Sequence, residues 1–155
     1  MTLDLENFVP YRITVLASHI AVTFAKQHAE RFGLSIPEWR VVAVLGRYDG
    51  LSSGEVMERT SMDKAKVSRA VTRLTAAGII HRDENVKDLR SNHLHLTARG
   101  RDIHDKITPI AQRLEQDLLS ALTEDERRAF LRTLETLDRR VREMGKETGQ
   151  LDSHI

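Results

Sequence analysis

Three serine or threonine residues, each followed three positions later by a glutamate, divide this chain into helical segments. The pairs are Ser35 with Glu38, Ser52 with Glu55, and Thr123 with Glu126. This spacing is the capping box, in which the two residues satisfy each other's free amides at the start of a helix. Apolar residues follow each box at steps of three and four. The pattern predicts a mainly α-helical chain.

The helix signals have gaps that indicate one small β-hairpin. We expect helices over 10–32, from Ser35 to the Tyr48–Gly50 turn, and over about 52–59, 63–77, 97–120 and 123–144. The run 39–45 is apolar nearly all round, which is typical of a helix packed between other elements, although its β-branched residues also suit a strand. Segments 79–83 and 92–96 are predicted strands joined by a polar loop, and the tail from Gly145 is predicted to fray.

Composition limits the classes of protein that remain. The 155 residues suit one domain, and no apolar run is long enough to span a bilayer. The first ten residues lack the basic start of a secretory signal, so we expect a cytoplasmic protein with no membrane partner. There is no cysteine, which excludes disulfides, thiolate catalysis and thiol-based redox sensing.

Sequence motifs give no support for an enzyme. The chain has no H-E-x-x-H, P-loop or G-x-S-x-G pattern, and we expect no cofactor. His81, His93 and His95 could lie near one another on the hairpin, which resembles a metal pair. Without cysteine or a clear third ligand, we expect no metal site there.

The helix predicted over 63–77 carries the strongest functional signal. It follows a short helix and a tight turn and precedes the hairpin, which is the order of a winged helix-turn-helix. Residues 55–101 hold ten basic and six acidic residues, as a segment that meets a polyanion would. The inward stripe of this helix leaves side chains that bind phosphates and base edges on its other faces: Lys64, Lys66, Ser68, Arg69, Thr72 and Arg73. Double-stranded DNA is the predicted partner.

The hairpin loop adds a second basic element. It contains Lys87, Asp88 and Arg90. An arginine at the tip of a wing suits the narrow minor groove, and Asp88 could hold Arg90 in position by a charge-assisted hydrogen bond. A solvated loop of mixed charge is the alternative.

The order of these motifs resembles the MarR (multiple antibiotic resistance regulator) family over nearly the whole chain. The most specific part is the Asp88-Leu89-Arg90 wing followed by Leu96-Thr97-Ala98-Arg99-Gly100. The resemblance implies a repressor-type regulator that binds a pseudo-palindromic operator as a homodimer and is released by a small aromatic or phenolic ligand. By position, it implies groove-reading roles for Lys64, Ser68, Arg69, Thr72 and Arg73, a minor-groove role for Arg90, and an orienting role for Asp88.

The resemblance also implies how the single domain 1–155 is divided. It implies that helices 10–32 and 97–145 form the dimer and that 35–96 forms the DNA-binding lobe. The wide apolar stripes of the terminal helices could be covered by a second copy of the chain or by a monomeric core. A ligand crevice between the two parts could include His19, Trp39 and Arg40, although these could equally be interface, core and surface residues.

Two functions compete with a specific regulator. A non-specific architectural DNA-binding protein would use the same basic helix, and a winged-helix protein-interaction module would bind no DNA. Preference for an operator over scrambled DNA separates the first from a regulator.

Overall fold

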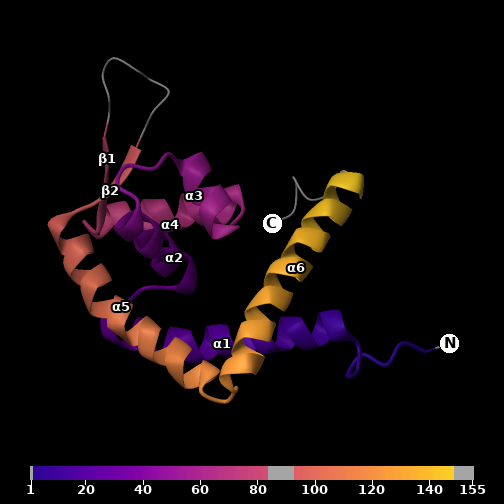
Figure 1. Cartoon of the computed structure of the whole chain (residues 1–155). Helices are drawn as coiled ribbons and strands as arrows, with labels where there is room; N and C mark the ends of the chain where they lie inside the picture. The colour runs from indigo at the N-terminus through magenta and orange to yellow at the C-terminus, as the bar shows by residue number, and fades with distance from the viewer. Residues whose placement is uncertain (1, 84–92, 149–155) are drawn as a thin grey trace.

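The computed structural model describes residues 2–83 and 93–148 and confirms a mainly helical chain with one hairpin (Figure 1). Six helices and two strands follow one another in an order that places the hairpin between the fourth and fifth helices. The elements are α1 (Val9–Phe32), α2 (Ile36–Arg47), α3 (Ser53–Thr60), α4 (Lys64–Ala76), β1 (Ile80–Asp83), β2 (His93–Leu96), α5 (Ala98–Leu119) and α6 (Glu124–Thr148).

The predicted caps start the helices within one residue of the expected positions. Ser35 and Ser52 each accept from the amide of the glutamate three residues later, whose carboxylate accepts from the amide of the capping residue. Thr123 makes the same reciprocal bonds ahead of α6. Asp63 accepts from Lys66 N at 2.8 Å, which caps α4. Local hydrogen bonding therefore fixes where these helices begin.

The hydrophobic core lies in the lobe formed by α2, α3, α4, the hairpin and the first half of α5. The predicted helix over 39–45 is confirmed, since these residues lie within α2, which packs against α3, α4 and α5. The largest fully buried side chains all lie in this lobe or in the part of α5 beside it: Leu45, Leu74, Ile80, Leu94, Ile107, Val41, Val42, Val56 and Val67.

The two strands pair antiparallel and are anchored to the helices by a third segment. Their register runs from Ile80 opposite Leu96 to Asp83 opposite His93. Leu51, just before α3, exchanges backbone hydrogen bonds with Leu94, at 3.2 Å for Leu51 N to Leu94 O and 2.8 Å for the reverse. The base of the hairpin is thus held beside the start of α3.

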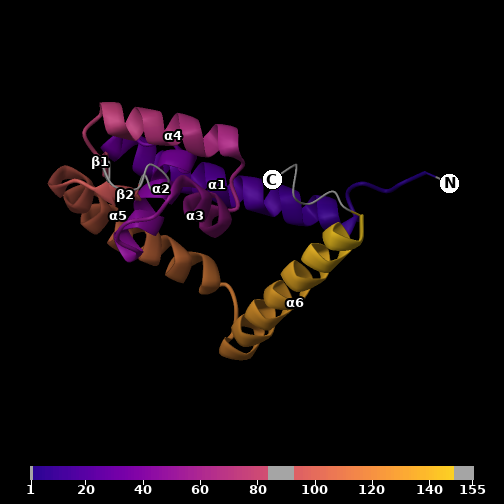
Figure 2. The same cartoon turned by 90° about the horizontal axis from the view of Figure 1, so that it is seen from above.

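The long helices leave much apolar surface uncovered by the rest of the chain. Helix α1 packs against α5, whereas α6 stands apart from the lobe and packs extensively against no other described element (Figures 1 and 2). Apolar side chains remain exposed along α1 and α6: Val9, Ile13, Leu16, Phe130, Leu134, Leu137, Val141 and Met144.

The end of α6 differs from the sequence prediction. The helix continues through Gly145 to Thr148, where fraying was predicted from Gly145 onward. One glycine inside a helix costs only about 1 kcal/mol relative to alanine, which does not stop a helix on its own. Within the described residues, no helix is both long and apolar enough to cross a membrane.

Candidate nucleic-acid interface

The turn between α3 and α4 sets the angle at which α4 leaves the lobe. Ser61 takes a left-handed backbone conformation, with φ 52° and ψ 33°, directly after α3. Met62 then buries its side chain in the core, and Asp63 caps α4. Because Met62 is buried directly before the cap, the first residue of α4 is held against the lobe.

Helix α4 has one buried face and one face open to solvent. Val67, Ala70, Val71 and Leu74 are buried, as their spacing predicts. Figure 2 shows α4 along the outer edge of the lobe. All six residues predicted to meet DNA on this helix are exposed: Lys64, Lys66, Ser68, Arg69, Thr72 and Arg73.

The six exposed residues fall into a central strip and two flanks. At 3.6 residues per turn, Arg69 and Thr72 point more directly away from the buried stripe than the other four. Lys64 and Ser68 lie on the flank away from α2. Lys66 and Arg73 lie seven residues apart on the flank that faces the start of α2. That flank borders a hollow of about 190 Å³ lined by Ser35, Pro37, Glu38, Lys66, Arg69, Ala70 and Arg73.

Carboxylates neutralise part of the flank that faces α2. The Asp63 carboxylate lies 3.4 Å from the Lys66 ammonium, and Glu38 Oε1 lies 3.7 Å from Arg73 Nη1. The hydrogen bond from the Lys66 amide, more than the lysine charge, holds the pKa of Asp63 below its usual value. Lys64 and Arg69 form no ion pair within the described part of the chain, so they are the cations of α4 most available to a polyanion.

The hydroxyl groups of α4 are partly committed to the helix itself. Thr72 Oγ1 donates to the Ser68 carbonyl at 2.9 Å. A hydroxyl that donates to its own helix can still accept a hydrogen bond. Thr72 can therefore accept from a base amino group, while the Ser68 hydroxyl donates to no other described residue and keeps its proton available.

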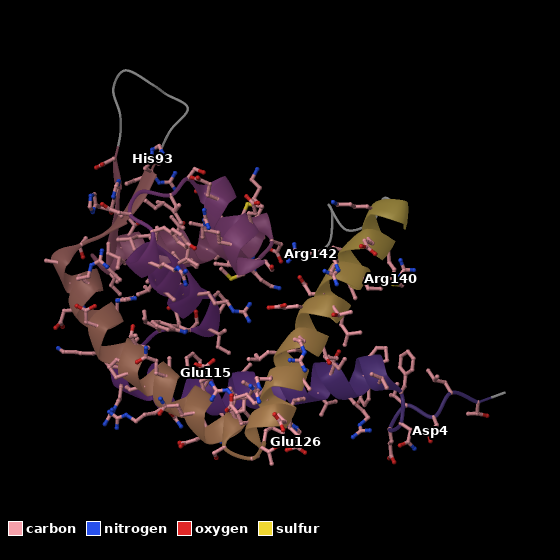
Figure 3. The ribbon with its side chains drawn as sticks, in the orientation of Figure 1. Asp4, His93, Glu115, Glu126, Arg140 and Arg142 are labelled. Atoms are coloured by element: carbon pink, nitrogen blue, oxygen red, sulfur yellow. The ribbon has the colours of Figure 1, made fainter. Side chains whose placement is uncertain are left out.

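The base of the predicted wing is described, but its tip is not. Lys87, Asp88 and Arg90 lie outside the described residues, so their predicted roles remain predictions. Figure 3 shows His93 at the end of the described part of the hairpin. At this base, His95 Nδ1 lies 2.9 Å from Asp49 Oδ1 and its Nε2 lies 3.1 Å from Asp83 Oδ2.

This histidine joins the hairpin to the turn after α2, a link that the sequence did not indicate. The His95 hydrogen bond lowers the pKa of Asp49. The His81 ring stacks on His95 with centroids 5.3 Å apart. Among the described side chains, no group of three or more histidines or carboxylates is placed to hold a metal ion.

The three residues nominated for a ligand site do not form one cluster around a hollow. His19 is exposed on α1 and Arg40 is exposed on α2. Trp39 is buried, and its ring centroid lies 6.1 Å from that of Phe24. A ligand role for them remains a prediction.

A larger hollow lies between α1 and α5, where the sequence predicted none. Its volume is about 540 Å³, and its lining combines Lys26, Gln27, Arg31, Ile110, Arg113, Leu114 and Asp117. A neighbouring hollow shares Arg31 and Arg113 and adds Phe32, Lys106 and Pro109. Cations around an apolar floor suit an organic anion. Such a site depends on two helices far apart in sequence lying side by side, which no local motif reveals.

Comparison with known proteins agrees with this geometry. The model of the MarR family matches residues 32–91. The HTH-type transcriptional repressor Rv2887 of Mycobacterium tuberculosis is 31% identical over 105 residues, which cover 68% of this chain and 76% of that protein.

Solved structures share the fold. A MarR/EmrR family transcriptional regulator from Acinetobacter sp. ADP1 superposes with a TM-score of 0.84 at 24% identity, covering 91% of this chain and 99% of that one. The PcaV transcriptional regulator of Streptomyces coelicolor, solved with its natural ligand, gives a TM-score of 0.77 at 22% identity, covering 89% and 96%. The chain belongs to the MarR family of winged helix-turn-helix transcriptional regulators, which are not enzymes.

Proposed function

We propose that this chain represses transcription as a homodimer on a pseudo-palindromic operator and releases the DNA when a small organic acid binds. The coarser part of this statement, a DNA-binding transcriptional regulator, follows from membership of the family. The exposed face of α4 carries the proposal, because Lys64 and Arg69 form no ion pair with any described residue and lie beside two hydroxyl groups. Each subunit places α4 in a major groove, and the two grooves lie about 34–36 Å apart.

The proposed roles of the side chains follow their positions on α4. Ser68, Arg69 and Thr72 lie on or beside the outward strip and read base edges. Arg69 donates to guanine, Ser68 donates to a base acceptor, and Thr72 accepts from a base amino group. Lys64, Lys66 and Arg73 contact phosphates. Lys87 and Arg90 act from the wing, with Asp88 orienting Arg90.

The proposed homodimer rests on the uncovered apolar surface of the long helices. Along α6 the exposed fractions run from 38% at Phe130 to 54% at Val141. These side chains step by four and three, which is the spacing of a helix–helix seam. A second copy would cover this seam and the exposed residues of α1, so that 10–32 and 97–145 form the dimer and 35–96 the DNA-binding lobe.

The proposed ligand is an amphipathic organic anion bound in the hollow between α1 and α5. Arg31 and Arg113 offer charge, and Ile110 and Leu114 offer an apolar floor. The likeness to PcaV supports the fold only, so this assignment depends on the hollow itself. The dimer can hold its two α4 helices at different distances from each other. A ligand that binds one of these arrangements more tightly raises its population, and DNA binding weakens when that arrangement does not match the operator.

A binding titration tests the DNA-binding proposal. The probe is the DNA upstream of the chain's own gene, against a scrambled duplex of the same length. Arg69→Ala should weaken binding by about 1–3 kcal/mol, whereas Arg132→Ala, the same charge change on α6, should alter it little. Equal affinity for both duplexes would instead indicate an architectural protein, and no binding to either would indicate an interaction module.

A further inference from the structure

One carboxylate sits inside the interface that the regulator presents to DNA. Glu38 is the buried charged residue of the described core, at 7% exposure. Its Oε2 accepts from the Ser35 amide at 3.0 Å, which completes the cap of α2. Its Oε1 faces Arg73 Nη1 at 3.7 Å. One side chain thus serves a helix cap with one oxygen and a DNA-facing arginine with the other.

The two partners differ in freedom to move. The Glu38 side chain is 9% exposed and held by the cap, whereas that of Arg73 is 76% exposed. The carboxylate is therefore the fixed member of the pair, and the guanidinium is the member that can swing to a phosphate. When Arg73 swings away, Glu38 keeps its cap bond but loses the nearby cation, and a buried charge without a partner is unfavourable.

We propose that Glu38 is a positioning residue that acts through Arg73 and lowers the sequence-independent part of DNA affinity. By holding Arg73 on the α2 side of α4, it lowers the affinity of this helix for the backbone of any DNA and leaves discrimination to the outward strip. The inference rests on the proposed DNA-binding function and names a regulation of the same surface. A glutamate so placed opposes every phosphate contact of Arg73, whatever the base sequence.

The charges around the hollow beside Glu38 support this role. Lys66, Arg69 and Arg73 line it. Asp63 pairs with Lys66 and Glu38 with Arg73, so the flank carries little net charge while Arg69 keeps its own. Phosphate contacts supply the sequence-independent part of DNA affinity, and base contacts supply the discrimination. Neutralising the flank should therefore lower the sequence-independent part of the affinity and leave base discrimination unchanged.

A purely structural role for Glu38 predicts different behaviour. Glutamine serves the capping box as well as glutamate does, so Glu38→Gln keeps the cap and removes only the charge. A residue that mattered for the cap alone would leave DNA binding of this variant unchanged. The variant therefore separates the cap from the proposed effect on Arg73.

The experiment measures binding to a scrambled duplex and to a duplex selected from a random pool, across a series of salt concentrations. We expect Glu38→Gln to bind scrambled DNA about two- to five-fold more tightly at low salt, the range typical of an exposed ion pair. The salt slope should steepen by up to about 0.9, the value of one phosphate contact. Affinity for the selected duplex should rise by a similar factor, because Arg73 contacts phosphate in both complexes.

Two matched variants complete the test. Glu115→Gln makes the same charge change on α5, well away from the helix-turn-helix (Figure 3), and should bind scrambled DNA as the parent does. In an Arg73→Gln background, Glu38→Gln should lose its effect. The inference is overturned if Glu38→Gln and Glu115→Gln behave alike, or if the gain persists without Arg73.

A second measurement leaves Glu38 untouched, in case its substitution prevents folding. Because Arg73 is already neutralised, Arg73→Gln should weaken binding to scrambled DNA less than Arg69→Gln does, and equal losses would contradict the inference. If the parent binds no DNA, both the proposed function and the inference fail. If Arg69→Gln weakens binding but the Glu38 effect is absent, only the inference fails.

Discussion

The tight packing of Gly100 in α5 against Ile79, the residue before β1, gives a quantitative test of the fold. A Cβ added at Gly100 would lie 2.1 Å from the carbonyl oxygen of Ile79. That oxygen accepts from Thr97 N at 3.0 Å, and the Thr97 hydroxyl beside it donates to Gly78 O at 2.7 Å. Because the obstacle is backbone, it cannot rotate away as a side chain would. Gly100→Ala must displace the junction between the start of α5 and the segment that leads into β1.

The size of the effect follows from what the displacement breaks. Two hydrogen bonds contribute about 0.5–1.5 kcal/mol each, and overpacking costs about 1–3 kcal/mol. Alanine recovers about 1 kcal/mol of helix propensity. We therefore expect the free energy of unfolding to fall by about 1–5 kcal/mol, with a central value of about 3 kcal/mol, which for a chain of this length lowers Tm by roughly 6–12 °C.

The matched control is another helical glycine with open space around it. A Cβ at Gly54 in α3 would meet nothing closer than Ser52 Oγ at 3.9 Å, so Gly54→Ala should raise stability by up to about 1 kcal/mol. Urea unfolding at one fixed protein concentration measures both variants, since stability depends on concentration in a dimer. If Gly100→Ala unfolds within about 0.5 kcal/mol of Gly54→Ala, the packing of α5 on Ile79 is wrong.

Three further predictions concern the dimer, the cap of α4 and the ligand. Leu134→Asp places a charge in the α6 seam and should convert the dimer into a monomer by light scattering, whereas Thr133→Asp, beside the seam, should not; a parent that is already monomeric refutes the seam. The folded-state pKa of Asp63 is lowered from 3.8, so its stabilisation is present above that value and is lost as pH falls through the lower folded pKa. Asparagine caps equally well but does not titrate, so Asp63→Asn should match the parent at pH 7 and lose less stability in acid; parallel pH curves would contradict this. Arg113→Glu should weaken binding of aromatic carboxylic acids and their thioesters in calorimetry while leaving affinity for ligand-free operator unchanged, and unaltered ligand affinity would remove the α1–α5 hollow as the site.

The helix boundaries and the two faces of α4 could be predicted because their causes are local. Ser35, Ser52 and Thr123 form hydrogen bonds with residues three positions away, so the caps could be predicted from the sequence alone. The stripe from Val67 to Leu74 follows from helical periodicity alone. Gly145 misled the prediction because propensity is a weak signal when good helix formers surround one glycine.

The tertiary contacts of the site could not be predicted, because they join residues far apart in the chain. Glu38 fitted a helix cap, and nothing in the sequence showed that its second carboxylate oxygen would face Arg73. The same holds for Asp49 and His95, which join α2 to the hairpin, and for Arg31 and Arg113 in the α1–α5 hollow. Each depends on how helices pack rather than on any motif.

A hydroxyl-radical footprint on the selected duplex tests most directly whether α4 meets DNA twice. We expect the two α4 helices to protect one side of the duplex at two positions about one helical turn apart. Arg69→Ala should remove both protected positions together, while Arg132→Ala should preserve them. A single protected position, or a footprint that survives Arg69→Ala unchanged, would contradict the placement of α4 against DNA.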